Sequence, residues 1–163
     1  MIWLMVTLAV LLLCFSGVLL VGAPYLPTLT PQVGAALELA DLQPGEMLLE
    51  LGCGDGKVLI AAARQGYRAV GYELNPLLAL VAWLRTRRYR RLVRVVWANF
   101  WTAKWPPTDA IFTFLLPKYM NKLDTIIAQN VQKPVKLVSF AFVIPNRPVI
   151  IAKDGVYLYL YED

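Results

Sequence analysis

Residues 48–56 constrain the fold of this chain more than any other stretch. They read Leu-Leu-Glu-Leu-Gly-Cys-Gly-Asp-Gly, so an apolar strand runs directly into three glycines at every second position, and a helical pattern begins at Lys57. A strand, a glycine turn and a helix in this order bring bare backbone against a nucleotide-like ligand. The stretch therefore predicts an α/β domain with a ligand site at the end of this strand.

Strand and helix patterns alternate over the rest of the chain, which is typical of a doubly wound parallel sheet. Asn75 and Thr30 are suited to cap helices that have proline at the first position. Near the C-terminus, Asp154-Gly155 joins two strand patterns, which predicts a hairpin. We therefore expect a Rossmann-like, doubly wound sheet of seven strands with a C-terminal antiparallel hairpin. The predicted strands are 47–51, 69–73, 93–97, 110–115, 136–142, 148–152 and 156–161, and the predicted helices are 31–42, 57–65, 76–89 and 118–130.

The N-terminal residues differ from the rest in composition. Residues 2–23 carry no charge and are nearly all apolar, with Trp3 and Tyr25 at the two ends. A helix of this length spans a hydrocarbon layer of roughly 30 Å, whereas a cleaved signal peptide has Lys or Arg before its apolar run. The pattern predicts a retained transmembrane helix at 1–23, a proline-rich connector at 24–34 and a folded domain at 35–163.

Six arginines crowd into ten residues of a chain whose net charge is +5. Beside a membrane anchor they could contact anionic lipid headgroups. They could equally be the solvated end of a helix whose dipole they complement. Nothing else in the sequence points to nucleic acid. The six are Arg85, Arg87, Arg88, Arg90, Arg91 and Arg94.

The sequence has no histidine and only two cysteines, Cys14 and Cys53. One lies in the apolar N-terminal segment and the other in the glycine turn, so we expect no disulfide. These counts exclude a Cys/His zinc site and both Ser-His-Asp and Cys-His catalysis. We expect no metal, and any chemistry must depend on positioning and on an activated cofactor.

The glycine spacing excludes two familiar nucleotide sites. A dinucleotide fingerprint needs its third glycine one residue later than Gly56, and a P-loop needs Ser or Thr after Lys57. The pattern that does match is Glu-x-Gly-x-Gly-x-Gly at 50–56, followed by a second acid, Glu73, at the end of the next predicted strand. It resembles motif I of the seven-strand S-adenosylmethionine-dependent methyltransferases, and the resemblance covers about residues 31–163.

This resemblance implies S-adenosyl-L-methionine as the cofactor. In that family the acid at the end of the second strand binds both ribose hydroxyls, a role that falls to Glu73, and Glu50 helps hold the amino end of the methionine moiety. Asn99 falls where the family often has an Asp that touches the adenine amine, and Phe100 could flank the adenine ring. The implied cofactor-binding residues are Glu50, Gly52, Cys53, Gly54, Gly56, Glu73, Leu74, Asn99 and Phe100.

The end of the predicted strand at 110–115 faces the methyl group in this fold. Together with the apolar N-terminal segment and residues 24–28 (Pro-Tyr-Leu-Pro-Thr), it resembles the small membrane-anchored lysine methyltransferases. These enzymes act on the ATP synthase c subunit and the adenine nucleotide translocase, and have prokaryotic relatives. The resemblance implies Phe114, Leu115 and Pro117 as catalytic residues, with Phe114 where that family often has Tyr.

The favoured function is methyl transfer to a lysine of a membrane-associated protein. A neutral amine attacks the sulfonium methyl in line, so catalysis is mainly proximity and alignment. Two alternatives stay open: methylation of a lipid or lipophilic small molecule, and S-adenosylmethionine binding without catalysis. We expect a single-pass protein of the prokaryotic inner membrane, or alternatively of the mitochondrial inner membrane, with its catalytic domain on the cytoplasmic side.

Overall fold

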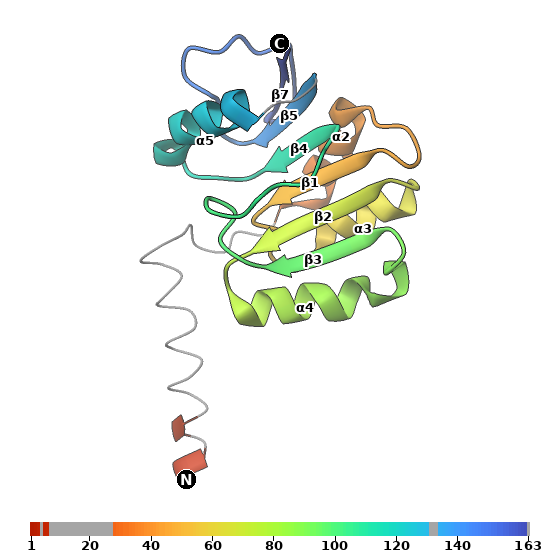
Figure 1. The fold of residues 1–163 in the computed structure, drawn as a ribbon, viewed down its shortest axis with the longest axis vertical. Helices are drawn as coiled ribbons and strands as arrows, with labels where there is room; N and C mark the ends of the chain where they lie inside the picture. Colours follow the sequence, from red (N-terminus) through yellow and green to blue (C-terminus); the bar gives the residue numbers. More distant parts are fainter. Residues whose placement is uncertain (4, 7–27, 131–133, 163) are drawn as a thin grey trace.

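The computed structural model describes residues 1–3, 5–6, 28–130 and 134–162. Within these residues seven strands form one sheet in the order β3-β2-β1-β4-β5-β7-β6 (Figure 1). This confirms the predicted seven-stranded, Rossmann-like sheet. The strands are β1 (Met47–Leu51), β2 (Arg68–Glu73), β3 (Val93–Trp97), β4 (Ala110–Thr113), β5 (Val135–Phe140), β6 (Ile151–Lys153) and β7 (Val156–Tyr161).

Strands β1 to β5 run parallel to one another. Their arrowheads in Figure 1 point to the same edge of the sheet. The turn after β1 and the ends of β2, β4 and β5 therefore meet at this carboxyl edge, which is where open α/β sheets bind their ligands.

The C-terminal hairpin forms as predicted. Strand β7 is antiparallel to both β5 and β6, so β7 lies inside the sheet and β6 lies at its edge. The turn residues Asp154 and Gly155 have φ of 51° and 75°. Two positive φ angles are what a two-residue type I′ turn requires, and Asp-Gly favours it.

Alternate strand residues face two separate cores. Leu48 of β1 packs with α2 (Thr30–Ala40), α3 (Lys57–Arg64) and α4 (Pro76–Thr86), whereas Leu49 packs with α5 (Pro117–Asn130). The sheet is thus covered on both faces, as the doubly wound pattern predicts.

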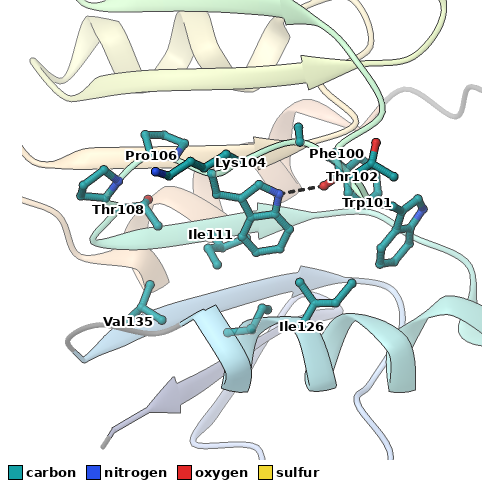
Figure 2. Close-up of a pocket in the computed structure, with 13 residues that line it drawn as sticks. Phe100, Trp101, Thr102, Lys104, Pro106, Thr108, Ile111, Ile126 and Val135 are labelled. Carbon is teal, nitrogen blue, oxygen red and sulfur yellow. Dashed lines mark hydrogen bonds between the residues drawn. The ribbon is translucent and has the colours of Figure 1, made fainter.

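A loop takes the place of a helix between β3 and β4. The indole Nε1 of Trp105 donates to the carbonyl oxygen of Phe100 at 2.8 Å, and the hydroxyl of Tyr72 donates to the carbonyl oxygen of Lys104 at 2.9 Å. A cavity of about 720 Å³ separates this loop from α5, with Ile111 and Ile126 among its lining residues (Figure 2).

The connection between β5 and β6, residues 141–150, also has no helix. The carboxylate of Asp124 on α5 accepts from Arg147 Nε and from the hydroxyl of Tyr161, both at 2.6 Å. The guanidinium of Arg147 also stacks 3.9 Å from the centroid of the Tyr161 ring. These contacts fix the connection to α5 and β7.

The start of α2 and the end of α4 differ from expectation in their local structure. Helix α2 starts at Thr30, with Leu29 as N-cap and no side-chain cap, so residues 30–34 of the predicted connector are helical and Thr30 caps nothing. The helix expected at 76–89 ends as an α-helix at Thr86 and continues as the 3₁₀ turn η1 (Arg87–Tyr89). The hydroxyl of Thr86 donates to the carbonyl oxygens of Ala82 and Trp83, a pattern that perturbs helices.

The predicted single-pass membrane localisation, at a prokaryotic or mitochondrial inner membrane, is contradicted. In the part of the chain that the structure describes, every helix is too short or too polar to cross a bilayer. Most of the predicted anchor, residues 4 and 7–23, lies outside the described residues.

Candidate functional site

Glu73 ends β2 at the carboxyl edge, and its carboxylate joins two elements. It is 7% exposed. Its Oε2 accepts from the backbone N–H of Gly54, and its Oε1 accepts from that of Asn75, both at 2.8 Å. The side chain of Asn75 in turn accepts from Leu77 and Leu78 and caps α4, as its sequence position predicts. Glu73 therefore fixes the glycine turn against the start of α4.

Glu50 lies near the end of the neighbouring strand β1 and is 4% exposed. Its Oε2 has no hydrogen-bond partner among the described residues. Burial, and then the negative charges of Asp55 and Glu73, raise the pKa of Glu50 well above its usual range. A buried carboxylate without a full set of partners is costly, so this position suits a ligand that brings a positively charged hydrogen-bond donor.

The glycine turn holds its shape through β2. The backbone N–H groups of Gly52 and Cys53 both donate to the carbonyl oxygen of Tyr72 at 2.9 Å. Gly52 has a φ of +87°, and a Cβ built there meets nothing within 4 Å. The turn therefore needs glycine for its backbone conformation and leaves open space beside the bare backbone.

Gly71 in the middle of β2 is a residue that sequence reasoning missed. A Cβ at this position would lie 2.6 Å from Leu59 Cδ1 and 2.7 Å from Cys53 Cβ. Burial and the charges of Glu50 and Glu73 raise the pKa of Cys53, so this thiol stays protonated and packs against β2. An isolated glycine inside a strand pattern is the signal that could have identified this close approach.

A second missed contact ties the turn to α4 and to the start of the domain. Asp55 forms an ion pair with Arg85, one of the six clustered arginines. Its other oxygen accepts from the backbone N–H of Lys57 at 3.2 Å, while Lys57 Nζ donates to the carbonyl oxygen of Thr28 at 2.9 Å. Residue 28 therefore lies beside the glycine turn.

Leu74, Asn99 and Phe100 come together at the same edge, next to Glu73. The N–H of Ala98 donates to the carbonyl oxygen of Glu73 at 3.0 Å, which joins the end of β3 to the end of β2. The side-chain oxygen of Asn99 accepts from the N–H of Trp101 at 3.0 Å. The Asn99 oxygen is thus already engaged in a turn.

The three residues predicted at the catalytic position have different surroundings. Phe114 is half-buried, and its ring centroid lies 4.6 Å from that of Phe140. Leu115 is 6% exposed and packs in the α5 core. Pro117 is exposed and is the first residue of α5. Of the three, Phe114 has the side chain placed at the carboxyl edge beside the ring of Phe140.

No group of His, Cys, Asp and Glu side chains in the described ranges could hold a metal ion. Asp109, the acid that precedes β4, is structural. Its Oδ2 accepts from the N–H of Met47 at 2.8 Å, at the end of the sheet opposite to the carboxyl edge.

Comparison with known proteins decides the family. Residues 50–150, more than half of the chain, match the family model described as the ANTKMT methyltransferase domain. The chain belongs to this family. The match begins at Glu50 and includes both buried acids and the glycine turn, so the predicted resemblance is confirmed.

Two relatives in this comparison are lysine methyltransferases by name. The chain is 32% identical over 127 residues to the Xenopus laevis lysine N-methyltransferase that is named for the ATP synthase c subunit, covering 76% of this chain and 55% of that protein. It is 28% identical over 149 residues to a protein-lysine N-methyltransferase of Saccharolobus islandicus, covering 84% of this chain and 92% of that protein. The chain thus spans about half the length of the frog relative and nearly all of the archaeal one.

A solved structure shares the fold. The RNA methyltransferase from Salinibacter ruber, in complex with S-adenosyl-L-homocysteine, superposes with a TM-score of 0.76 at 29% identity. The match covers 83% of this chain and 92% of that one. S-adenosyl-L-homocysteine is what S-adenosylmethionine becomes after giving up its methyl group.

Proposed function

We propose that this protein is an S-adenosylmethionine-dependent methyltransferase that modifies lysine side chains of a protein. The observation that carries the proposal is the pair of buried acids, Glu50 and Glu73, on either side of a glycine turn that leaves backbone bare. Family membership and the names of the relatives support the same reaction.

The two buried carboxylates fit this cofactor. The unpartnered Oε2 of Glu50 is suited to the amino group of the methionine moiety, and the carboxylate of Glu73 is suited to the ribose hydroxyls. S-adenosylmethionine supplies a methyl group on positively charged sulfur, whose C–S bond breaks as the acceptor nitrogen forms the new bond. We assign cofactor binding to Glu50, Gly52, Cys53, Gly54, Gly56, Glu73, Leu74, Asn99 and Phe100.

The chain's own contribution to the chemistry is positioning and exclusion of water. The acceptor amine must first lose a proton, which passes to solvent, and an apolar pocket favours the neutral amine by desolvation. Phe114 would line that pocket, while Leu115 packs against α5 and Pro117 begins that helix. Proximity and alignment then account for the rate.

The names of the relatives support a choice of acceptor protein. One of them is named for the ATP synthase c subunit, and we propose this class of lysine-bearing membrane protein as the substrate to test first. RNA is the second candidate, because the solved neighbour is named an RNA methyltransferase and because all six clustered arginines are exposed.

Transfer of labelled methyl groups tests the proposal. The full chain would be incubated with tritiated S-adenosylmethionine and a cell extract, and the label followed through protease digestion, ribonuclease digestion and organic extraction. We expect protease-sensitive label on lysine by mass spectrometry, lost in Glu73→Ala and kept in the surface control Glu162→Ala. Ribonuclease-sensitive or lipid-extracted label would reassign the substrate, and cofactor binding without transfer would reduce the protein to a binding module.

A further inference from the structure

Three phenylalanine rings from two strand ends gather at the carboxyl edge. The centroid of the Phe114 ring lies 4.6 Å from that of Phe140 and 6.3 Å from that of Phe142. All three side chains are half-buried. Apolar rings that stay partly open at the ligand edge of a sheet are available to a ligand as well as to the core.

The backbone between the last two rings has an uncommon conformation. Ala141 has a φ of +68°, in the left-handed region that a residue with a Cβ seldom adopts. Two hydrogen bonds fix the bend: the Ala141 N–H donates to the carbonyl oxygen of Gly155 at 2.8 Å, and the buried Ser139 hydroxyl donates to that of Phe142 at 2.7 Å. Such strain persists where the surroundings impose it, often at functional sites.

Strand register brings this bend to the reacting end of the site. Thr113, the residue before Phe114, is paired with Leu51, the residue before the glycine turn. Thr113 is also paired with Ser139, the residue before Phe140. Phe114 and Phe140 therefore each follow a paired position by one residue, and Phe142 lies two residues further on. This places the rings next to the glycine turn, which we assign to the methionine moiety.

We propose that Phe140 and Phe142, together with Phe114, form the binding site for the acceptor amine. The inference rests on the proposed function and adds two residues to it. The ligand class is an unbranched alkyl amine such as the lysine side chain. Its methylenes pack on the rings, and the ring faces attract its ammonium form by cation–π interaction. After that form has lost its proton to solvent, the neutral amine presents its lone pair to the methyl group.

A binding experiment with n-butylamine, which mimics the lysine side chain, tests this site without turnover. Saturation-transfer NMR would be recorded on the full chain with saturating S-adenosyl-L-homocysteine. We expect Phe142→Ala to weaken n-butylamine binding about two- to fivefold, as loss of an exposed cation–π contact does, while Val149→Ala, in the same connection, leaves it unchanged. Unchanged binding in folded Phe140→Ala and Phe142→Ala proteins would overturn the proposal.

A second variant guards against loss of folding. Phe142→Leu keeps apolar volume and removes the aromatic face, so it should weaken n-butylamine binding while the thermal midpoint stays close to that of the wild type. Wild-type affinity in Phe142→Leu would show that the ring face has no role.

Kinetics separate this inference from the proposed function. With the purified ATP synthase c subunit as acceptor, Phe142→Leu should raise KM for the protein with little change in kcat or in the affinity for S-adenosyl-L-homocysteine. Methyl transfer with an unchanged KM would contradict the proposed amine site but not the proposed methyltransferase activity. If the wild type transfers no methyl group but binds n-butylamine through the rings, the methyltransferase activity would be contradicted and the amine site would not.

Discussion

At the scale of single residues, two buried acids define the site and only one of them is fully paired. Both Glu73 oxygens accept backbone N–H groups, whereas Glu50 keeps one oxygen without a partner in the described chain. An unpaired buried carboxylate weakens the ligand-free fold. The arrangement is consistent with a site whose polar requirements are met only when a cationic ligand is bound.

The raised pKa of Glu50 gives a pH-dependent prediction. Between the unfolded pKa of about 4.3 and the higher folded value, the folded state binds more protons, so stability falls as pH rises. Glu50→Gln removes this titration. Urea unfolding from about pH 4 to pH 8 should show a flatter profile for Glu50→Gln than for wild type, with a difference of about 1.4 kcal/mol for each pH unit that separates the folded from the unfolded pKa. Matching profiles would mean that Glu50 is solvated or paired.

The left-handed Ala141 gives a second residue-scale prediction. A side chain in this region costs roughly 1–2 kcal/mol, and glycine relieves that cost while adding some unfolded-state entropy. Ala141→Gly should therefore raise the free energy of unfolding by about 1 kcal/mol in urea titrations. A destabilised variant would argue that the methyl group packs usefully where it is.

At the scale of elements, the close approach of β2 to the glycine turn and to α3 is the tightest constraint on the site. Gly71→Ala places a methyl group within 2.8 Å of Leu59 and Cys53 atoms. We expect a loss of about 1–3 kcal/mol in unfolding free energy and weaker binding of S-adenosyl-L-homocysteine. Gly34→Ala on α2, where a Cβ meets nothing within 4 Å, is the control and should gain about 0.5–1 kcal/mol. Equal behaviour of the two variants would contradict this packing.

The elements that were predicted correctly are those whose sequence signals lie within a few residues of one another. The bounds of β1 and β3 match the expected 47–51 and 93–97, and the Asp-Gly turn and the Asn75 cap form as expected. Helix α2 begins earlier than expected because its first turn depends on Pro31 and not on a side-chain cap.

The site contacts that the sequence did not reveal join residues far apart in the chain. Asp55 forms an ion pair with Arg85 on α4, and Cys53 packs against Gly71. Phe140 and Phe142 contact Phe114 only because β5 pairs with β4. No local spacing encodes these distances. The glycine turn and the two buried acids were predictable because a family pattern carries them, whereas the gathering of the three phenylalanine rings depends on the register of β4 and β5.

At the scale of the whole molecule, the five parallel strands bring five separate segments to one edge. These segments are the glycine turn, the start of α4, the loop after β3, the segment after β4 that carries Phe114, and the bend after β5. In our proposal the first half of the sheet supplies the cofactor side of the site, and the second half supplies the acceptor side. A methyltransferase of this kind needs both sides to be ordered before its substrates bind.

The central claim is that this edge binds S-adenosylmethionine through Glu50, Glu73 and the glycine turn. Calorimetric titration of S-adenosyl-L-homocysteine into the purified full chain tests it most directly. We predict one binding site in the wild type and at least about tenfold weaker binding, about 1.4 kcal/mol, in Glu73→Gln, with Glu162→Gln unchanged. No heat of binding in folded wild-type protein, or equal affinity in folded Glu73→Gln, would contradict the claim.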